Sequence, residues 1–326
     1  MQFVAVTDTS GNLPTHIAQE RDLKMIPFAY YIDGERLTCL DTASFDGDAF
    51  YAALKNTNVK TSQINPAEYA DFFEPFLKDG KDVVYVSMSS GISGSCQSAM
   101  LGAEQLKEQY PDRTVEIVDT LGASLGEGLV AVEAARLRDE GLSAGEAAKR
   151  LRLLSERMFN VFTVNDLMFL RRGGRLSNLS AIVGTVLGIK PILKGGEDGR
   201  ISAFDTVRSR RRSIKALAAQ YEQYVVDADR QTIGIAHAAC REDAELLISL
   251  IKEGEHPPKE ILLVDYEPVT GSHVGPGALA LFFESCAGVR AVKGLDTIPE
   301  KVKGLIEDAR KKIAGRKKTV HTIVRV

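Results

Sequence analysis

Short apolar segments alternate with amphipathic ones over the first half of the chain, and this alternation constrains the fold most strongly. The apolar segments have strand length, and the segments between them have the 3.6-residue spacing of a helix that buries one face. We expect strands at 2–8, 82–88 and 115–120, and helices at 65–80, 96–110, 125–141 and 143–158. Parallel strands need a crossover connection between them, usually a helix. The first half is therefore predicted to be an α/β layer with a parallel sheet.

The second half differs in character. Its segment 176–189 is almost uncharged and rich in small and β-branched residues, which is typical of a core or of the wall of an apolar cavity. Segment 275–285 is expected to begin a helix at Gly-Pro-Gly. A chain of 326 residues is long for one core, so we expect two α/β domains, 1–160 and 161–326, the second ending in a charged tail.

Charge and composition exclude several classes of function. The net charge of −3 does not favour nucleic acid or an anionic membrane as the main partner. No apolar run approaches the roughly 18 residues of a membrane span, which leaves at most transient membrane contact, and the first residues lack the pattern of a signal peptide. The cysteines form no C-x-x-C pair and are expected to be free thiols in a reducing cytoplasm: Cys39, Cys96, Cys240 and Cys286.

Searches for enzyme motifs give one match and several absences. Neither G-x-G-x-x-G after the first strand nor G-x-x-x-x-G-K-[ST] occurs, so no nucleotide or other cofactor is predicted. Residues 122–126 match the nucleophile elbow G-x-S-x-G around Ser124, and Asp265 and His273 follow in the expected order. However, strand 115–119 ends several residues before Ser124, whereas an elbow serine lies at the strand-to-helix corner. A helix start packed on the sheet is favoured instead.

Two hydroxyl-rich loops are candidate anion sites. Ser93, Gly94 and Ser95 open a helix, where free N–H groups and the helix dipole attract anions. The alternative is that Ser93 or Ser95 only caps that helix. Thr61 and Ser62 precede another helix start, and their hydroxyls could donate to an anion or simply make local turns.

Basic groups occur in two further glycine-rich segments. His273 lies in GSHVGPG, where it could bind a carboxylate, assist a serine in hydrolysis or be structural. The segment RRGGR, from Arg171 to Arg175, ends a predicted helix. Arginines there are normal capping residues, and they also supply charge for an anion.

Taken together, these segments resemble the DegV family, fatty-acid-binding proteins that serve as acyl-binding subunits of bacterial fatty acid kinase. The resemblance covers about residues 3–285, and nine short motifs occur in family order. They are TDTSGNLP (7–14), KTSQINP (60–66), SSGISGSCQSA (89–99), VDTLGASLGEG (118–128), FLRRGGRLS (169–177), GIKPIL (188–193), DGRI (198–201), VR (207–208) and GSHVGPGA (271–278). In this family the fourth motif begins a helix and holds no nucleophile. The chain differs in its tail of about 40 further residues and in Ile92-Ser93-Gly94-Ser95, where Leu-Ser-Gly-Thr is commoner.

The resemblance implies a two-domain DegV-like fold with a parallel-sheet N-terminal domain that contributes carboxylate-binding loops. The second domain, also α/β, would hold the acyl chain in a tunnel. By position, Thr61 and Ser93 are similar to the hydroxyls that bind the carboxylate, and His273 is similar to the histidine that contacts it. Their neighbours Ser62 and Gly94 join the predicted site.

The resemblance also implies charged contacts. One arginine of RRGGR is expected near the head group, either Arg171 or Arg175. Arg208 resembles a surface arginine that docks the kinase. The implied ligand is a long-chain fatty acid such as palmitate, stearate or oleate.

The sequence therefore predicts a cytoplasmic carrier that is not itself an enzyme and that presents a fatty acid carboxylate to the catalytic subunit of a kinase. The alternative is a serine hydrolase that cleaves an acyl ester with Ser93 or Ser124 and His273. A third reading places another anionic lipid in the same pocket.

Overall fold

The computed structural model describes residues 3–54, 56–176 and 189–291. A four-stranded sheet in the first half has the order β2-β1-β6-β7 and is parallel throughout. Its strands are β1 (Phe3–Asp8), β2 (Lys24–Ile26), β6 (Asp82–Ser87) and β7 (Val115–Asp119). The parallel sheet predicted from the alternation of segments is thus confirmed.

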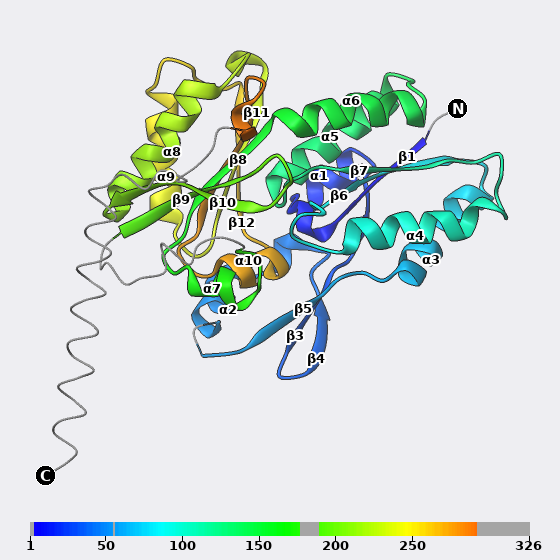
Figure 1. The fold of residues 1–326 in the computed structure, drawn as a ribbon, viewed down its shortest axis with the longest axis horizontal. Helices are drawn as coiled ribbons and strands as arrows, with labels where there is room; N and C mark the ends of the chain where they lie inside the picture. The colour runs from blue at the N-terminus through cyan, green and yellow to red at the C-terminus, as the bar shows by residue number, and fades with distance from the viewer. Residues whose placement is uncertain (1–2, 55, 177–188, 292–326) are drawn as a thin grey trace, which may run out of the picture.

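Helices cover both faces of this sheet (Figure 1). Those of the first half are α1 (Thr15–Glu20), α2 (Gly47–Ala53), α3 (Pro66–Lys78), α4 (Ser95–Lys107), α5 (Leu125–Asp139) and α6 (Ala144–Arg157). Helices α3 and α4 pack on one face, while α5 contacts strands of both large sheets from the other. The apolar residues of α5 and α6 thereby join one core that continues into the second half.

The second half is built on a six-stranded mixed sheet of order β10-β9-β8-β13-β11-β12, in which only β11 and β12 pair in parallel. The strands are β8 (Met158–Thr163), β9 (Ile189–Gly195), β10 (Ile201–Arg208), β11 (Thr232–His237), β12 (Glu260–Asp265) and β13 (Leu279–Glu284). The helices are α7 (Met168–Arg172), α8 (Arg210–Tyr224), α9 (Arg241–Lys252) and α10 (Pro268–Val274). Helices α8 and α9 cover the face turned away from α5 (Figure 1).

The prediction of a helix that begins at Gly275 is wrong, because residues 279–284 form strand β13. This strand lies between β8 and β11 and pairs antiparallel with both. A short apolar run such as this one is compatible with a buried strand or a buried helix, and its period does not distinguish them. Long-range pairing with two neighbours decides the outcome here.

A small antiparallel sheet, β4-β3-β5, carries one of the predicted ligand-binding loops. Its strands are β3 (Ala29–Ile32), β4 (Glu35–Thr38) and β5 (Val59–Ser62). Asp33 and Gly34, with φ of 52° and 91°, make the two-residue turn between β3 and β4. Positive φ at both positions is the requirement of a tight two-residue hairpin turn.

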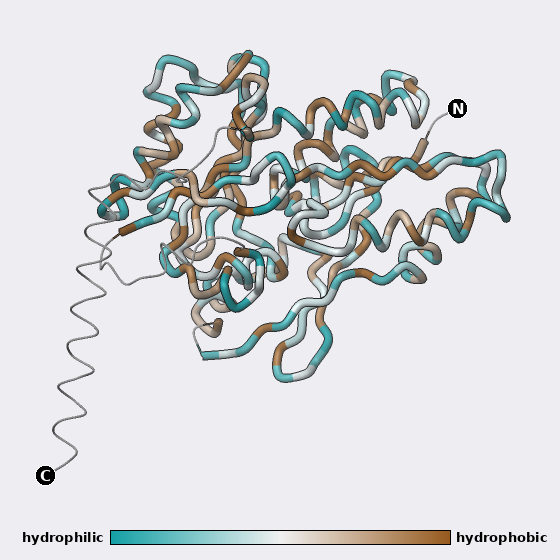
Figure 2. The backbone as a smooth tube through the Cα atoms, viewed as in Figure 1, coloured by the Kyte–Doolittle hydropathy of each residue, from teal (hydrophilic) through white to brown (hydrophobic). Residues whose placement is uncertain are grey.

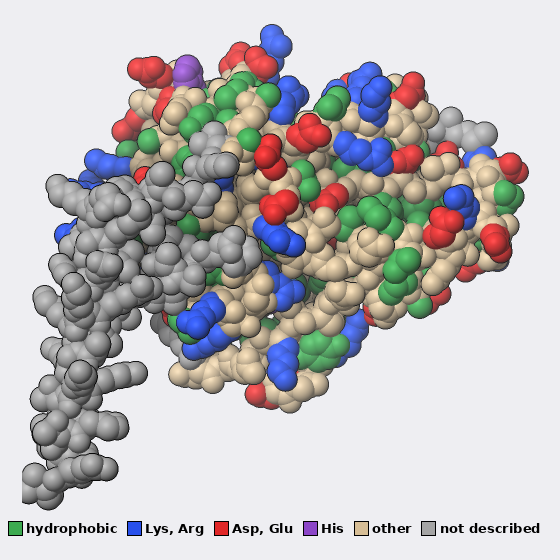
Figure 3. Space-filling model, viewed as in Figure 1, with side chains coloured by type: hydrophobic (Ala, Val, Ile, Leu, Met, Phe, Trp, Pro, Cys, Tyr) green, Lys and Arg blue, Asp and Glu red, His purple; other side chains and the backbone are tan. Residues whose placement is uncertain are grey.

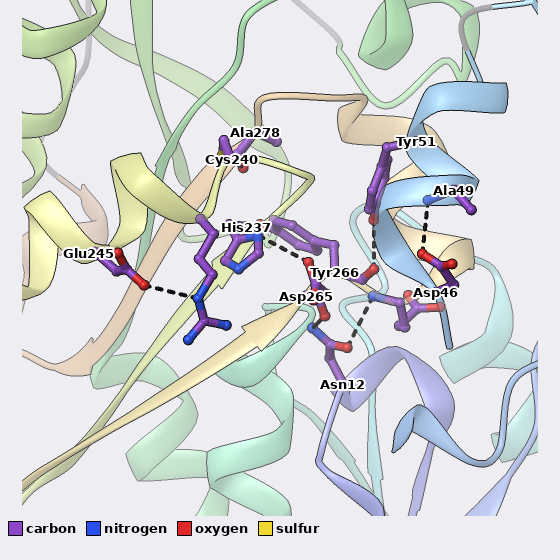
Figure 4. A network of polar contacts seen from close by, with 12 residues as sticks. Asn12, Asp46, Ala49, Tyr51, His237, Cys240, Glu245, Asp265, Tyr266 and Ala278 are labelled. Carbon is purple, nitrogen blue, oxygen red and sulfur yellow. Dashed lines mark hydrogen bonds and ion pairs between the residues drawn. The ribbon is translucent and has the colours of Figure 1, made fainter. Parts of the chain in front are cut away.

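Side chains from the first half hold the segment between β12 and α10 in place (Figure 4). The Asn12 amide donates to the carbonyl of Asp265 over 3.1 Å and accepts from the N–H of Glu267. The Tyr51 hydroxyl donates to the carbonyl of Tyr266 over 2.6 Å. These hydrogen bonds join elements of the first half of the chain to the second half. The predicted domain boundary at residue 160 lies inside β8, and the division into two domains stays a prediction.

A pair of buried carboxyl groups lies where β1 ends. The Ser10 hydroxyl contacts an oxygen of Asp8 and lies 2.8 Å from Glu127. Tyr85 donates to Asp8 over 2.5 Å and Thr7 donates to Glu127 over 2.9 Å. Burial, and then the charge of Asp8, raise the pKa of Glu127 well above its ordinary value. Burial also raises the pKa of Asp8, so both carboxyl groups hold a proton more readily in the fold than in water.

The outside of the molecule is mixed in polarity. Apolar residues concentrate along the strands and on one side of most helices (Figure 2). On the face seen in Figure 3, Lys and Arg side chains are interspersed with Asp and Glu. None of the helices in the described ranges combines the length and the apolar character that crossing a bilayer demands. Segment 177–188 and the predicted tail from residue 292 lie outside the described residues.

Candidate functional site

Two predicted site residues that are distant in the chain form a hydrogen-bonded pair. Thr61 Oγ1, on β5, lies 2.8 Å from His273 Nε2, on α10. The Glu267 carboxylate caps α10 by accepting from the N–H groups of Val269 and Thr270. Because β5 pairs with β3, and the hydrogen bonds described above hold the start of α10, both partners come from anchored backbone. This pair links the two halves of the chain at the site.

The His273 imidazole is neutral near pH 7. Burial, and then the positive charge of Arg175, lower its pKa to about 4. A neutral imidazole has one N–H donor and one acceptor nitrogen. The Nδ1 edge faces Gly173, where any added Cβ would overlap the ring. The ring is therefore held between the Thr61 hydroxyl and a stretch of bare backbone.

Arg175 connects the RRGGR segment to the serine loop. Its Nε donates to the carbonyl of Ile92 over 3.0 Å, and its guanidinium also donates to the carbonyl of Gly173. Desolvation lowers its pKa from the ordinary value, yet an arginine keeps its charge at any physiological pH. Arg175 lines the cavity described below, whereas Arg171, on α7, is absent from the described lining. The geometry favours Arg175 of the two predicted arginines.

The serine loop before α4 combines a cap with a cavity wall. The Ser93 hydroxyl accepts from the N–H of Ser95 over 3.2 Å and lies 3.0 Å from the Ser95 hydroxyl. Ser93 thus pairs with the first N–H of α4 from outside the N-cap position, and it also lines the cavity, so neither serine is the N-cap residue. Gly94 occupies the N-cap position, and a side chain there would overlap the amide of Gln63. Gly94 contributes close packing, and no part of it is in the described lining.

A narrow, largely apolar cavity of about 90 Å³ opens beside these groups. The apolar lining is Phe28, Met88, Ile92, Leu121, Phe162, Leu170, Ile201, Tyr266, Val269, Val274 and Phe282. The predicted residues Thr61, Ser62, Ser93, Arg175 and His273 share the wall with the polar residues Gln63, Ser124, Asn160 and Thr270. The predicted apolar segment 176–189 is described only at its ends, so its contribution lies outside the described residues.

An open surface cleft adjoins the cavity. It shares Thr61, Arg175 and His273 with the cavity wall, and Lys60 and Arg172 also line it. The three shared residues therefore lie at the boundary between the apolar cavity and a surface cleft that carries two further basic side chains. An anionic group bound to them would be reachable from outside.

The remaining predicted residues lie elsewhere or have other partners. Arg208 is exposed at the end of β10 and is not in the cavity lining. Ser124 lies five residues beyond the end of β7, and its hydroxyl accepts a hydrogen bond from the Asn12 amide over 3.1 Å. Within the described ranges, no hydrogen bond joins His273 to Ser93 or Ser124. The arrangement of a serine hydrolase is therefore not assembled.

Sequence reasoning missed Asn160 and Ser124 as cavity residues. Asn160 interrupts the apolar strand 158–164, and a polar residue in such a strand is a signal that could have been used. Ser124 has a φ of 54°, a conformation that costs energy for any residue except glycine. No sequence pattern reveals that conformation.

Comparisons with known proteins concern the family and the fold. A family model described as uncharacterised proteins of the DegV family matches residues 2–285. A DegV domain-containing protein of Clostridium perfringens is 35% identical over 283 residues, 86% of this chain and 97% of that protein. A solved fatty-acid-binding DegV family protein from Thermus thermophilus superposes with a TM-score of 0.79 at 26% identity, covering 88% of this chain and 100% of that one. A fatty-acid-binding DegV family protein from Streptococcus agalactiae gives 0.76 at 30% identity, covering 86% and 98%.

Proposed function

The chain belongs to the DegV family, and on that premise we propose that it binds a long-chain fatty acid and presents the carboxylate to a partner kinase. The acyl chain would occupy the apolar cavity, with its carboxylate at Thr61, His273 and Arg175. The observation that carries the proposal is the Thr61–His273 hydrogen bond at the boundary between that cavity and the surface cleft. Similar proteins of known structure bind fatty acids, which supports the choice of ligand.

The energetics of the site suit an amphipathic ligand. About 15 methylene and methyl groups, at roughly 0.8 kcal/mol each, give on the order of 10 kcal/mol before the costs of binding are subtracted. An unpaired carboxylate in the same place would cost several kcal/mol. Hydroxyl groups of Thr61 and Ser93, with the Arg175 charge, offset that cost. The apolar cavity binds the hydrocarbon of the fatty acid, and these groups hold its carboxylate.

The same arrangement leaves the carboxylate usable as a nucleophile. The Thr61 hydroxyl is neutral, and so is the His273 imidazole that is hydrogen-bonded to it, so neither transfers a proton to the carboxylate oxygen. The surface cleft gives a phosphoryl donor on another protein a route to the head group. We assign ATP binding to that partner, because this sequence has no phosphate-loop motif. Arg208, exposed on β10, is the proposed docking residue for the kinase, and the cytoplasm is the proposed location.

Fatty acid binding is tested by denaturing the purified protein and analysing the extracted lipid by mass spectrometry. We expect one fatty acid per polypeptide chain, and displacement titrations with palmitate, stearate and oleate should give the same number. Another anionic lipid in the extract, or no saturable binding of any of the three acids, would contradict the proposal. A burst of product from an activated acyl ester, abolished in Ser93→Ala or Ser124→Ala, would favour the hydrolase.

Presentation to a kinase needs a separate experiment. The loaded protein is mixed with a fatty acid kinase catalytic subunit and ATP, and acyl phosphate is trapped with hydroxylamine as the hydroxamate. We expect hydroxamate only with all three components, and less of it with Arg208→Ala at unchanged fatty acid affinity. Arg200→Ala, which removes another exposed arginine just before β10, is the matched control. Equal hydroxamate from both variants would remove Arg208 from the docking surface.

A further inference from the structure

One polar side chain in the cavity wall has no task in holding a carboxylate. Asn160, on β8, is only 6% exposed and lines the cavity. Among the residues that the structure describes, neither its Nδ2 nor its Oδ1 has a hydrogen-bond partner. Buried side-chain amides in folded proteins are nearly always paired. The described part of the chain therefore supplies no hydrogen-bond partner for this amide.

The surroundings make room for this amide. An added Cβ at Gly126 would overlap Oδ1, and one at Gly122 would come within 2.7 Å of Nδ2. At Gly195 it would lie 3.5 Å from Nδ2. These glycines come from the β7–α5 loop, from α5 and from the end of β9, whereas Thr61 and His273 belong to β5 and α10. The amide is thus a second polar position in the wall, built from different elements than the head-group site.

An unsubstituted hydrocarbon fits this wall poorly. If it filled the cavity beside Asn160, it would return no hydrogen bond to an amide whose two polar atoms are already buried and unpartnered among the described residues. A hydroxyl group is the smallest substituent that satisfies both atoms, since it donates to Oδ1 and accepts from Nδ2. A keto oxygen could accept from Nδ2 alone. The chemistry of the amide therefore selects a hydroxyl.

We infer that the preferred ligand is a hydroxylated long-chain fatty acid whose chain hydroxyl binds the Asn160 amide. This inference rests on the proposed function, which places the acyl chain in the cavity, and it adds the class of fatty acid that binds there. Sites that hydrogen-bond a ligand hydroxyl discriminate strongly against analogues that lack it, because the buried polar group is then left unpaired. Asn160 is accordingly a specificity residue, and the head-group residues supply general affinity.

The test compares stearate with its monohydroxy positional isomers, covering the whole chain, by displacement of a fluorescent fatty acid. We expect at least one isomer to bind the natural protein about ten-fold or more tightly than stearate does. Asn160→Leu should abolish that preference and bind stearate at least as tightly as the natural protein does. Asn160→Val, which suits a strand, replaces it if the leucine variant does not fold.

Thr163→Val is the matched control. Thr163 lies on the same strand, is fully buried and has an unpartnered hydroxyl, but it is outside the described cavity lining. Its replacement should leave the hydroxyl preference intact. The inference is overturned if stearate binds as well as every isomer, if the preference survives Asn160→Leu, or if an ordered water alone occupies the amide in a stearate complex. Failure of stearate and of all isomers to bind would instead refute the proposed function.

Discussion

Replacing Thr61 with valine removes the hydroxyl that pairs with His273 and keeps the side-chain shape. Valine is β-branched like threonine and suits strand β5, so the backbone should be unaffected. The variant leaves His273 Nε2 without its partner at 2.8 Å and takes one donor from the bound carboxylate. Binding should therefore weaken while the fold persists.

The size of the effect follows from the charge of the ligand. A hydrogen bond to a charged group contributes about 1.5 to 3 kcal/mol. At roughly 1.4 kcal/mol per factor of ten, Kd should rise about 10- to 150-fold. Because Thr61 is only half-buried, we expect the free energy of unfolding to change by less than about 1 kcal/mol.

Displacement of a fluorescent fatty acid measures Kd, and urea unfolding of the ligand-free protein measures stability. Thr38→Val is the matched control, since Thr38 is exposed on β4 of the same small sheet. It should change neither quantity. A folded Thr61→Val protein with unchanged Kd, or an equal loss of affinity in Thr38→Val, would refute the reasoning.

Three further predictions concern packing and pH. Gly173→Ala should weaken fatty acid binding with little loss of helicity, because its φ of −70° suits alanine while the new methyl overlaps the His273 ring; calorimetry and circular dichroism check this. The folded pKa of His273, about 4, lies below the ordinary 6.5, so the ligand-free protein should lose stability as pH falls from 6.5 toward 4, by up to about 1.4 kcal/mol per unit. His273→Gln should flatten that slope in urea titrations. For Glu127 the folded pKa lies above 4.5, so stability should fall as pH rises above 4.5, and Glu127→Gln should reduce this slope. A slope unchanged in the variant would contradict the raised pKa of Glu127.

The fold could be predicted from sequence where periodicity and length agree. Segments 82–88 and 115–120 are short, apolar and separated by a helix, and both became strands of the parallel sheet. Segment 275–285 was misassigned because its apolar run carries no distinguishing period. Only its neighbours β8 and β11, distant in the chain, make it a strand.

The candidate site, too, could be predicted from sequence only in part. Motif positions singled out Thr61, Ser93 and His273, and all three line one cavity. Sequence could not choose between Arg171 and Arg175, because the choice depends on the path of the chain after α7 ends at Arg172. The role of Gly173 was also hidden, since it follows from the position of an imidazole a hundred residues further along.

A crystal structure of the protein with bound stearate tests the central claim most directly. We predict continuous density for the chain inside the cavity lined by Phe162 and Phe282, with carboxylate oxygens within hydrogen-bond distance of Thr61 Oγ1 and near Arg175. A carboxylate placed at Asn160 with the tail toward His273, or a chain bound outside this cavity, would contradict the account.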